Sequence, residues 1–142
     1  MSSPDGTRPT EAQPPNTPEP EPLDFDRLSL EAATPEEHRR AAAECSSGTP
    51  PRRWQACTWL GAWHLTREEL VSARRHLEAA CEAGHALGCV GLGAVWMRGG
   101  PIVTSEGLLR DPARAQAAWQ RACELGEEAG CRLSNELKTD AK

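Results

Sequence analysis

The chain has 142 residues and a formal net charge of −5, from 16 basic and 21 acidic side chains, which is enough for one domain. It contains no Lys/Arg block longer than two residues, no apolar run long enough to cross a bilayer, and no basic and apolar N-terminal regions of a secretory signal. This composition argues against nucleic acid and membrane as partners, and no metal-ligand or cofactor motif stands out.

Residues 1–26 are predicted to be a disordered, acidic, Pro-rich tail. They hold seven of the twelve prolines, and six acidic residues stand against Arg8 alone, so they carry the whole net charge. So polar a segment buries too little apolar surface to offset the entropy of ordering it. We therefore expect a folded domain over 27–138 and a short C-terminal tail over 139–142.

Apolar spacing and helix-end signals predict six helices in three hairpins, at 34–46/53–65, 67–83/86–97 and 112–125/128–138. Capping boxes are expected to open helices at Thr34 and Thr66, and Asp111 before a proline opens another. The glycines that stand three residues after a cysteine are expected to end helices in a left-handed conformation: Gly48, Gly84 and Gly126. The predicted fold class is all-α, with a turn at Gly99-Gly100-Pro101.

The cysteines repeat with the chain. Cys81 and Cys123 each stand in Ala-Cys-Glu-x-Gly, and each is followed by another cysteine eight positions later. A degenerate earlier copy contains Cys45 and then Cys57, twelve positions on. A pattern that recurs in this way indicates an array of helical units.

These residues resemble a known family. The segment 92–103, Leu-Gly-Ala-Val-Trp-Met-Arg-Gly-Gly-Pro-Ile-Val, is similar to the signature of Sel1-like repeats, and Trp119 with Ala122-Cys123 is similar to the later half of that unit. The paired cysteines resemble the cysteine-rich subfamily typified by Helicobacter cysteine-rich proteins. The resemblance covers about residues 34–138 and implies an α/α solenoid of about three Sel1-like, TPR-like hairpins. Ser134-Asn135 departs from it, because Leu-Gly would be expected there.

Each cysteine pair is expected to join the end of one helix to the start of the next, at distances that suit a disulfide. The candidates are Cys45, Cys57, Cys81, Cys89, Cys123 and Cys131. Reduced cysteines packed in the core, reactive thiols and a metal site are the alternatives. The lack of a signal segment favours the cytoplasm, whereas oxidised pairs favour an extracytoplasmic compartment, so localisation stays open.

An enzyme is not expected. Some cysteine-rich Sel1 proteins are named as β-lactamase-like, but lysine occurs only at 138 and 142, so neither Ser-x-x-Lys nor Lys-Thr-Gly can be built. The four histidines are interpreted as surface or interface side chains: His38, His64, His76 and His85.

The leading hypothesis is a non-enzymatic adaptor that binds a protein or peptide through a concave helical face. The candidate contact residues are Trp59, Trp63, Trp96, Arg52 and Arg53. The competing interpretation is that the tryptophans fill gaps between alanine-rich helices. A β-lactamase-like hydrolase and an immunity or inhibitor protein are the alternative functions, and self-association through uncapped repeat ends is a further possibility.

Overall fold

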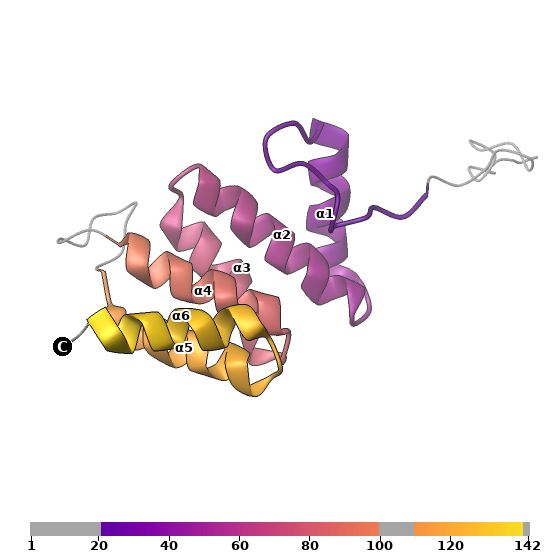
Figure 1. Cartoon of the computed structure of the whole chain (residues 1–142). Helices are drawn as coiled ribbons and strands as arrows, with labels where there is room; N and C mark the ends of the chain where they lie inside the picture. The colour runs from indigo at the N-terminus through magenta and orange to yellow at the C-terminus, as the bar shows by residue number, and fades with distance from the viewer. Residues whose placement is uncertain (1–20, 100–109, 141–142) are drawn as a thin grey trace, which may run out of the picture.

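The structure, a computed structural model, describes residues 21–99 and 110–140. Within these residues it is entirely helical, with no strand (Figure 1). The helices are α1 (Pro35–Ser47), α2 (Arg52–Thr66), α3 (Leu70–Glu82), α4 (Ala86–Arg98), α5 (Pro112–Glu124) and α6 (Glu128–Asp140). The all-α prediction and its six helices are confirmed. The turn expected at Gly99-Gly100-Pro101 falls largely outside the described residues.

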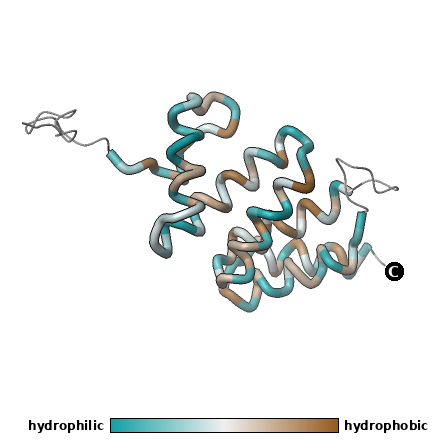
Figure 2. Tube along the Cα trace, turned by 180° about the vertical axis from the view of Figure 1, so that it is seen from behind, coloured by the Kyte–Doolittle hydropathy of each residue, from teal (hydrophilic) through white to brown (hydrophobic). Residues whose placement is uncertain are grey.

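Every helix packs against the next one along the chain. Helix α2 also contacts α4, and α4 contacts α6, so these three helices form one row of a stack. In Figure 2, hydrophilic and hydrophobic positions interchange along most helices, as expected for helices with one face inside. The predicted succession of antiparallel hairpins therefore has the expected packing order.

Most of the predicted helix ends are confirmed. At the start of α1, the Thr34 hydroxyl accepts a hydrogen bond from the Glu37 N–H at 3.0 Å, and the Glu37 carboxylate accepts one from the Thr34 N–H at 2.9 Å. The Asp111 carboxylate caps α5 by accepting from the Arg114 N–H. Gly84 and Gly126 have φ of 92° and 98°, the left-handed conformation expected of them.

Three details of the expected ends are wrong. Gly48 follows the last residue of α1, as expected, but it is extended instead of left-handed, with φ −73° and ψ 174°. The Thr66 capping box does not form, because α2 continues through Thr66, whose hydroxyl donates to the Trp63 carbonyl. The left-handed residue of this turn is instead Glu68, with φ 59°, and α3 begins only at Leu70. At the other end of the chain, α6 runs to Asp140, so the C-terminal tail does not begin at 139.

All six cysteines lie in the described residues and form three disulfides: Cys45–Cys57, Cys81–Cys89 and Cys123–Cys131. The paired Cα atoms are 4.5–4.8 Å apart. Each bridge joins the end of one helix to the start of the next, at the α1–α2, α3–α4 and α5–α6 turns. The predicted staples are confirmed, and the reduced alternative is set aside for this structure.

Two clusters of buried side chains make up the interior. The larger joins α3, α4 and α5, and includes Leu77, Val95 and Trp119. The smaller lies between α1 and α2 around Trp59 and Leu60. Leu77 and Trp119 hold corresponding positions, and each packs on a corresponding glycine of the row formed by α2, α4 and α6: Leu77 on Gly61 and Trp119 on Gly93.

The packed part of the chain begins before α1. Residues 21–33, which we name the strap, run against α1 and α2, and their half-buried apolar side chains contact the smaller cluster. These side chains are Leu23, Phe25, Leu28, Leu30 and Ala33. The boundary expected after residue 26 is therefore corrected, because Leu23 and Phe25 are packed and not part of a free tail. Residues 1–20 lie outside the described residues.

Candidate functional site

The strap is held along α2 by side chains that donate to its main-chain carbonyls. Arg52 donates to the Leu23 carbonyl at 3.0 Å, and Trp59 Nε1 donates to the Leu28 carbonyl at 3.0 Å. Arg67, just past the end of α2, donates to the Leu30 carbonyl at 3.3 Å. On α1, Arg40 donates to the carbonyl of Glu21. The donors and acceptors follow the same order, so the strap runs in the direction of α2.

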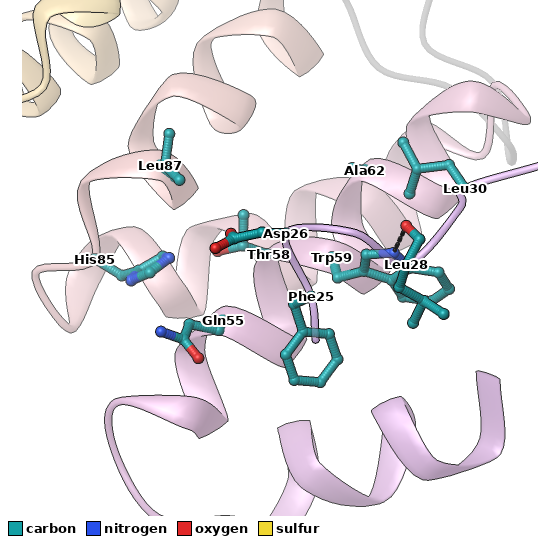
Figure 3. A pocket seen from close by; sticks show the side chains of 10 residues that line it. All are labelled: Phe25, Asp26, Leu28, Leu30, Gln55, Thr58, Trp59, Ala62, His85 and Leu87. Carbon is teal, nitrogen blue, oxygen red and sulfur yellow. Dashed lines mark hydrogen bonds between the residues drawn. The ribbon is translucent and has the colours of Figure 1, made fainter. Parts of the chain in front are cut away.

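A hollow of about 320 Å³ opens between the strap, α2 and the start of α4 (Figure 3). Its lining is mainly apolar, and the strap and α2 supply most of it. In Figure 3, Leu87 and His85 approach from the α3–α4 side, opposite the strap. The lining residues are Phe25, Asp26, Leu28, Leu30, Gln55, Thr58, Trp59, Ala62, His85 and Leu87.

Leu87 marks the rim of the hollow. Its side chain is 48% exposed, and the other exposed large apolar side chain in the described residues is Leu125, at the α5–α6 turn. A leucine exposed beside an apolar hollow is the type of feature that protein contacts cover. Leu125 does not line this hollow.

Polar groups in the hollow are few and specific. The Thr58 hydroxyl is shielded from solvent and has no hydrogen-bond partner in the structure. Burial lowers the pKa of His85, which keeps its imidazole neutral at pH 7. Asp26, on the strap, brings the only charged side chain of the lining. Such a site accepts an apolar group and offers a few directional contacts beside it.

The structure places Trp59 and Trp96 in the interior. Trp59 is 5% exposed beneath the strap, and Trp96 is 7% exposed in the larger cluster, where the guanidinium groups of Arg74 and Arg114 lie over its ring. The burial of these two tryptophans agrees with the interpretation that they fill gaps between alanine-rich helices. Trp59 nevertheless contributes to the site, because its ring borders the hollow and its N–H holds the strap.

Trp63, Arg52 and Arg53 are half-buried and already have partners. The Arg67 guanidinium stacks on Trp63 at 3.7 Å from the ring centre. Arg52 pairs with Glu44 in addition to holding the strap, and Arg53 donates to the Cys45 carbonyl. The structure thus brings Trp59, Trp63 and Arg52 to the α1–α2–strap region, and Trp96 lies apart from them.

Three histidines that are far apart in the sequence meet around Trp63. The His64 and His76 rings stack with centres 5.4 Å apart, and the His38 ring lies 4.3 Å from Trp63. Burial is the main cause that lowers the pKa of His38 and of His76, and the charge of His64 adds to it in both. Sequence spacing did not reveal this cluster, because its members come from α1, α2 and α3.

Within residues 21–99 and 110–140, no group of three or more His, Cys, Asp or Glu side chains is arranged to hold a metal ion. Among the same residues, no helix is both long and apolar enough to span a bilayer.

Comparison of the chain with protein-family models, with curated proteins and with solved structures finds no match. The site therefore has to be interpreted from its own geometry. The signal for the strap was present in the sequence as Leu23, Phe25, Leu28 and Leu30 within an acidic stretch. Their spacing follows neither a helix nor a strand, so periodicity alone could not assign them.

Proposed function

We propose that this chain is a non-enzymatic adaptor of the Sel1-like, α/α-solenoid kind, which binds a segment of another protein on the α2–α4 face. The observation that carries the proposal is that α2 already holds a non-helical polypeptide segment, the strap, through hydrogen bonds to its main chain. A surface that binds one such segment in this way has the chemistry to bind another.

The hollow is the proposed pocket for one large apolar side chain of the partner. Interfaces derive most of their binding energy from a few large side chains that enter desolvated pockets. A volume of about 320 Å³ admits a side chain such as leucine or phenylalanine together with the adjoining main chain. Leu87 on the rim and the neutral His85 extend the contact beyond the hollow. The three disulfides fix the helix turns, which lowers the entropy cost of presenting this surface.

A display library of random peptides, selected on the full chain, tests the proposal. Selected peptides are expected to lose at least tenfold in affinity for the Leu87→Glu variant, because a charge at the rim opposes burial of an apolar anchor. Leu125→Glu is the matched control, since Leu125 is similarly exposed at 41% and lies at a different turn. Equal losses in the two variants, or none in either, would show that the α2–α4 face is not the binding site.

The absence of an enzymatic activity is part of the proposal. It is supported by the positions of the lysines, since Ser134 and Lys138 are one residue too far apart for Ser-x-x-Lys. In the structure Ser134 is buried and hydrogen-bonded to the Gln116 and Gln120 side chains. Turnover of nitrocefin by the purified chain above the rate of a heat-inactivated sample would reinstate the β-lactamase-like alternative.

A further inference from the structure

We propose that the strap is a displaceable occupant of a groove along α1 and α2, and that the partner segment of this groove is acidic and leucine-rich. The inference rests on the proposed function and adds the chemical class of the partner. It also implies that the binding surface is larger than the hollow, because the part beneath the strap is exposed only when the strap leaves.

The groove contacts the main chain of the strap through hydrogen bonds. The four donors to the strap, Arg40, Arg52, Trp59 and Arg67, all bind carbonyl oxygens, and none of these four hydrogen bonds is made to a strap side chain. Main-chain contacts are indifferent to sequence, so a segment of different sequence can make the same four. Arg52 and Trp59 are seven residues apart, about two helical turns, so they lie on one face of α2, and Arg67 follows directly after the end of that helix.

Charge defines which segments fit. Three of the four donors are arginines, whereas the strap has four acidic residues against Arg27, a net charge of −3. Complementary potentials of this kind select partners by sign and speed their association. The apolar positions of the strap, Leu23, Phe25, Leu28 and Leu30, contact the smaller cluster. A competing segment therefore needs leucine-like and acidic residues interspersed along the chain.

The strap is attached less firmly than the helices. Its apolar side chains are only half-buried, and no disulfide reaches it, since the first cysteine of the chain is Cys45 in α1. Within the strap there are two local turns: the N–H groups of Arg27 and Leu28 donate to the Asp24 carbonyl, and those of Glu31 and Ala32 donate to the Ser29 hydroxyl. Segments with few buried contacts open at a lower free energy than the body that carries them.

A trans peptide tests displacement directly. The probe is an N-acetylated, fluorescein-labelled peptide with the sequence of residues 21–33, titrated into the full chain and into a full-chain Phe25→Ala/Leu28→Ala variant. A tethered segment competes at an effective concentration in the millimolar range, so weakening it frees the groove. The variant is expected to bind the probe at least tenfold more tightly than the unmodified chain. Equal affinity for the two proteins would overturn the proposal.

Two further arms examine charge and structure. In the same variant background, Arg52→Ala and a probe with its four acidic residues replaced by lysine are each expected to weaken binding at least fivefold. In the unmodified chain, hydrogen exchange at the Arg27 and Leu28 amides is expected to accelerate when the probe is present in excess. Binding to the unmodified chain that leaves these amides protected would contradict the proposal even if the strap variant were poorly folded. In a folded strap variant, binding that is unchanged by the charge reversal would contradict it as well.

The proposed function and this inference fail in different ways. One outcome is that the selected peptides lose affinity in the Leu87→Glu variant but leave the strap amides protected. It would support the hollow as a binding site and contradict the proposal that the strap competes with the partner. The opposite outcome is that the probe displaces the strap, while no selected peptide loses affinity in the Leu87→Glu variant. It would support binding in the groove beneath the strap and contradict the proposal that a partner side chain is buried in the hollow.

Discussion

At the scale of single residues, the contact between Gly93 and Trp119 shows how this fold combines small and large side chains. The indole N–H of Trp119 donates to the Val90 carbonyl at 3.0 Å, which brings the ring onto the α4 main chain. A Cβ atom at Gly93 would lie 2.2 Å from Trp119 Nε1. Glycine is therefore required here for close approach.

Gly93→Ala is expected to destabilise the chain by about 1–3 kcal/mol, because overpacking against a buried ring outweighs the roughly 1 kcal/mol that alanine gains over glycine in a helix. Gly91→Ala is the comparison, since its Cβ would meet the Leu77 side-chain methyls, which can move. Its change in the free energy of unfolding is expected to stay within about 1 kcal/mol. Urea unfolding of both variants measures the difference, and a cost at Gly91 as large as at Gly93 would contradict the argument.

Helix ends at this scale were predictable where the signal is a side-chain cap. Thr34 and Asp111 cap as their sequences indicate, because the capping residue and its target N–H groups are neighbours in the chain. The turn at Glu68 was not predictable. Its left-handed conformation belongs to a Schellman motif that ends α2, in which the Glu68 and Glu69 N–H groups donate to the Leu65 and His64 carbonyls, and no glycine marks this position in Thr66-Arg67-Glu68-Glu69.

At the scale of the elements, the junction of α1, α2 and α3 is built around His38, His64 and His76. The cationic groups facing them are Arg67 and Arg75, and the Glu69 carboxylate lies 2.8 Å from His64 Nδ1. The Nε2 atom of His38 is buried and has no hydrogen-bond partner. Protonation of His38 and His76 would place positive charges close to Arg67 and Arg75, so the folded junction favours the neutral imidazoles of these two histidines.

Acid is therefore expected to destabilise the chain. The pKa values of His38 and His76 are lowered in the folded state from the ordinary value of 6.5, so the unfolded chain binds protons first. Stability from this pair is complete above pH 6.5 and declines as pH falls from there through the folded pKa values. Urea midpoints between pH 7.5 and 5.5 measure the decline. A His38→Gln/His76→Gln variant is expected to show a shallower slope, and an identical slope would contradict this account.

The positions of the helices were the most predictable part of the structure. Apolar residues at helical spacing locate all six helices, and their bounds lie within three residues of the expected ones. The strap was missed because it has no period, and its contacts with Trp59 and Arg67 span more than thirty residues. The same reason explains the histidines, since a cluster drawn from three helices has no local sequence signature.

At the scale of the whole molecule, the three disulfides are expected to supply a large part of the stability. Closing loops of this length contributes about 2–3 kcal/mol per bridge on the chain-entropy model. Full reduction is therefore expected to lower the urea midpoint substantially. Mass spectrometry after alkylation, with and without prior reduction, measures the state of the thiols. Alkylation of the native protein without a reductant would show that the bridges are open.

The candidate site was only partly predictable at this scale. Trp59 and Arg52 were selected from the sequence as contact residues, and in the structure they hold the strap on α2. Trp96 was selected for its position in the repeat, and the same position places it in the core. Leu87 and the hollow depend on how α2, α4 and the strap meet, which composition and spacing do not specify.

The order of the disulfides has a consequence for how the chain is made. Six cysteines permit fifteen pairings, and in the observed one every cysteine is joined to the next cysteine along the chain. A polypeptide that is oxidised as it is synthesised, from the N-terminus onward, meets these pairs in turn, and each pair is complete before the next thiol appears. Correct pairing then follows from the direction of synthesis alone, without reshuffling by an isomerase.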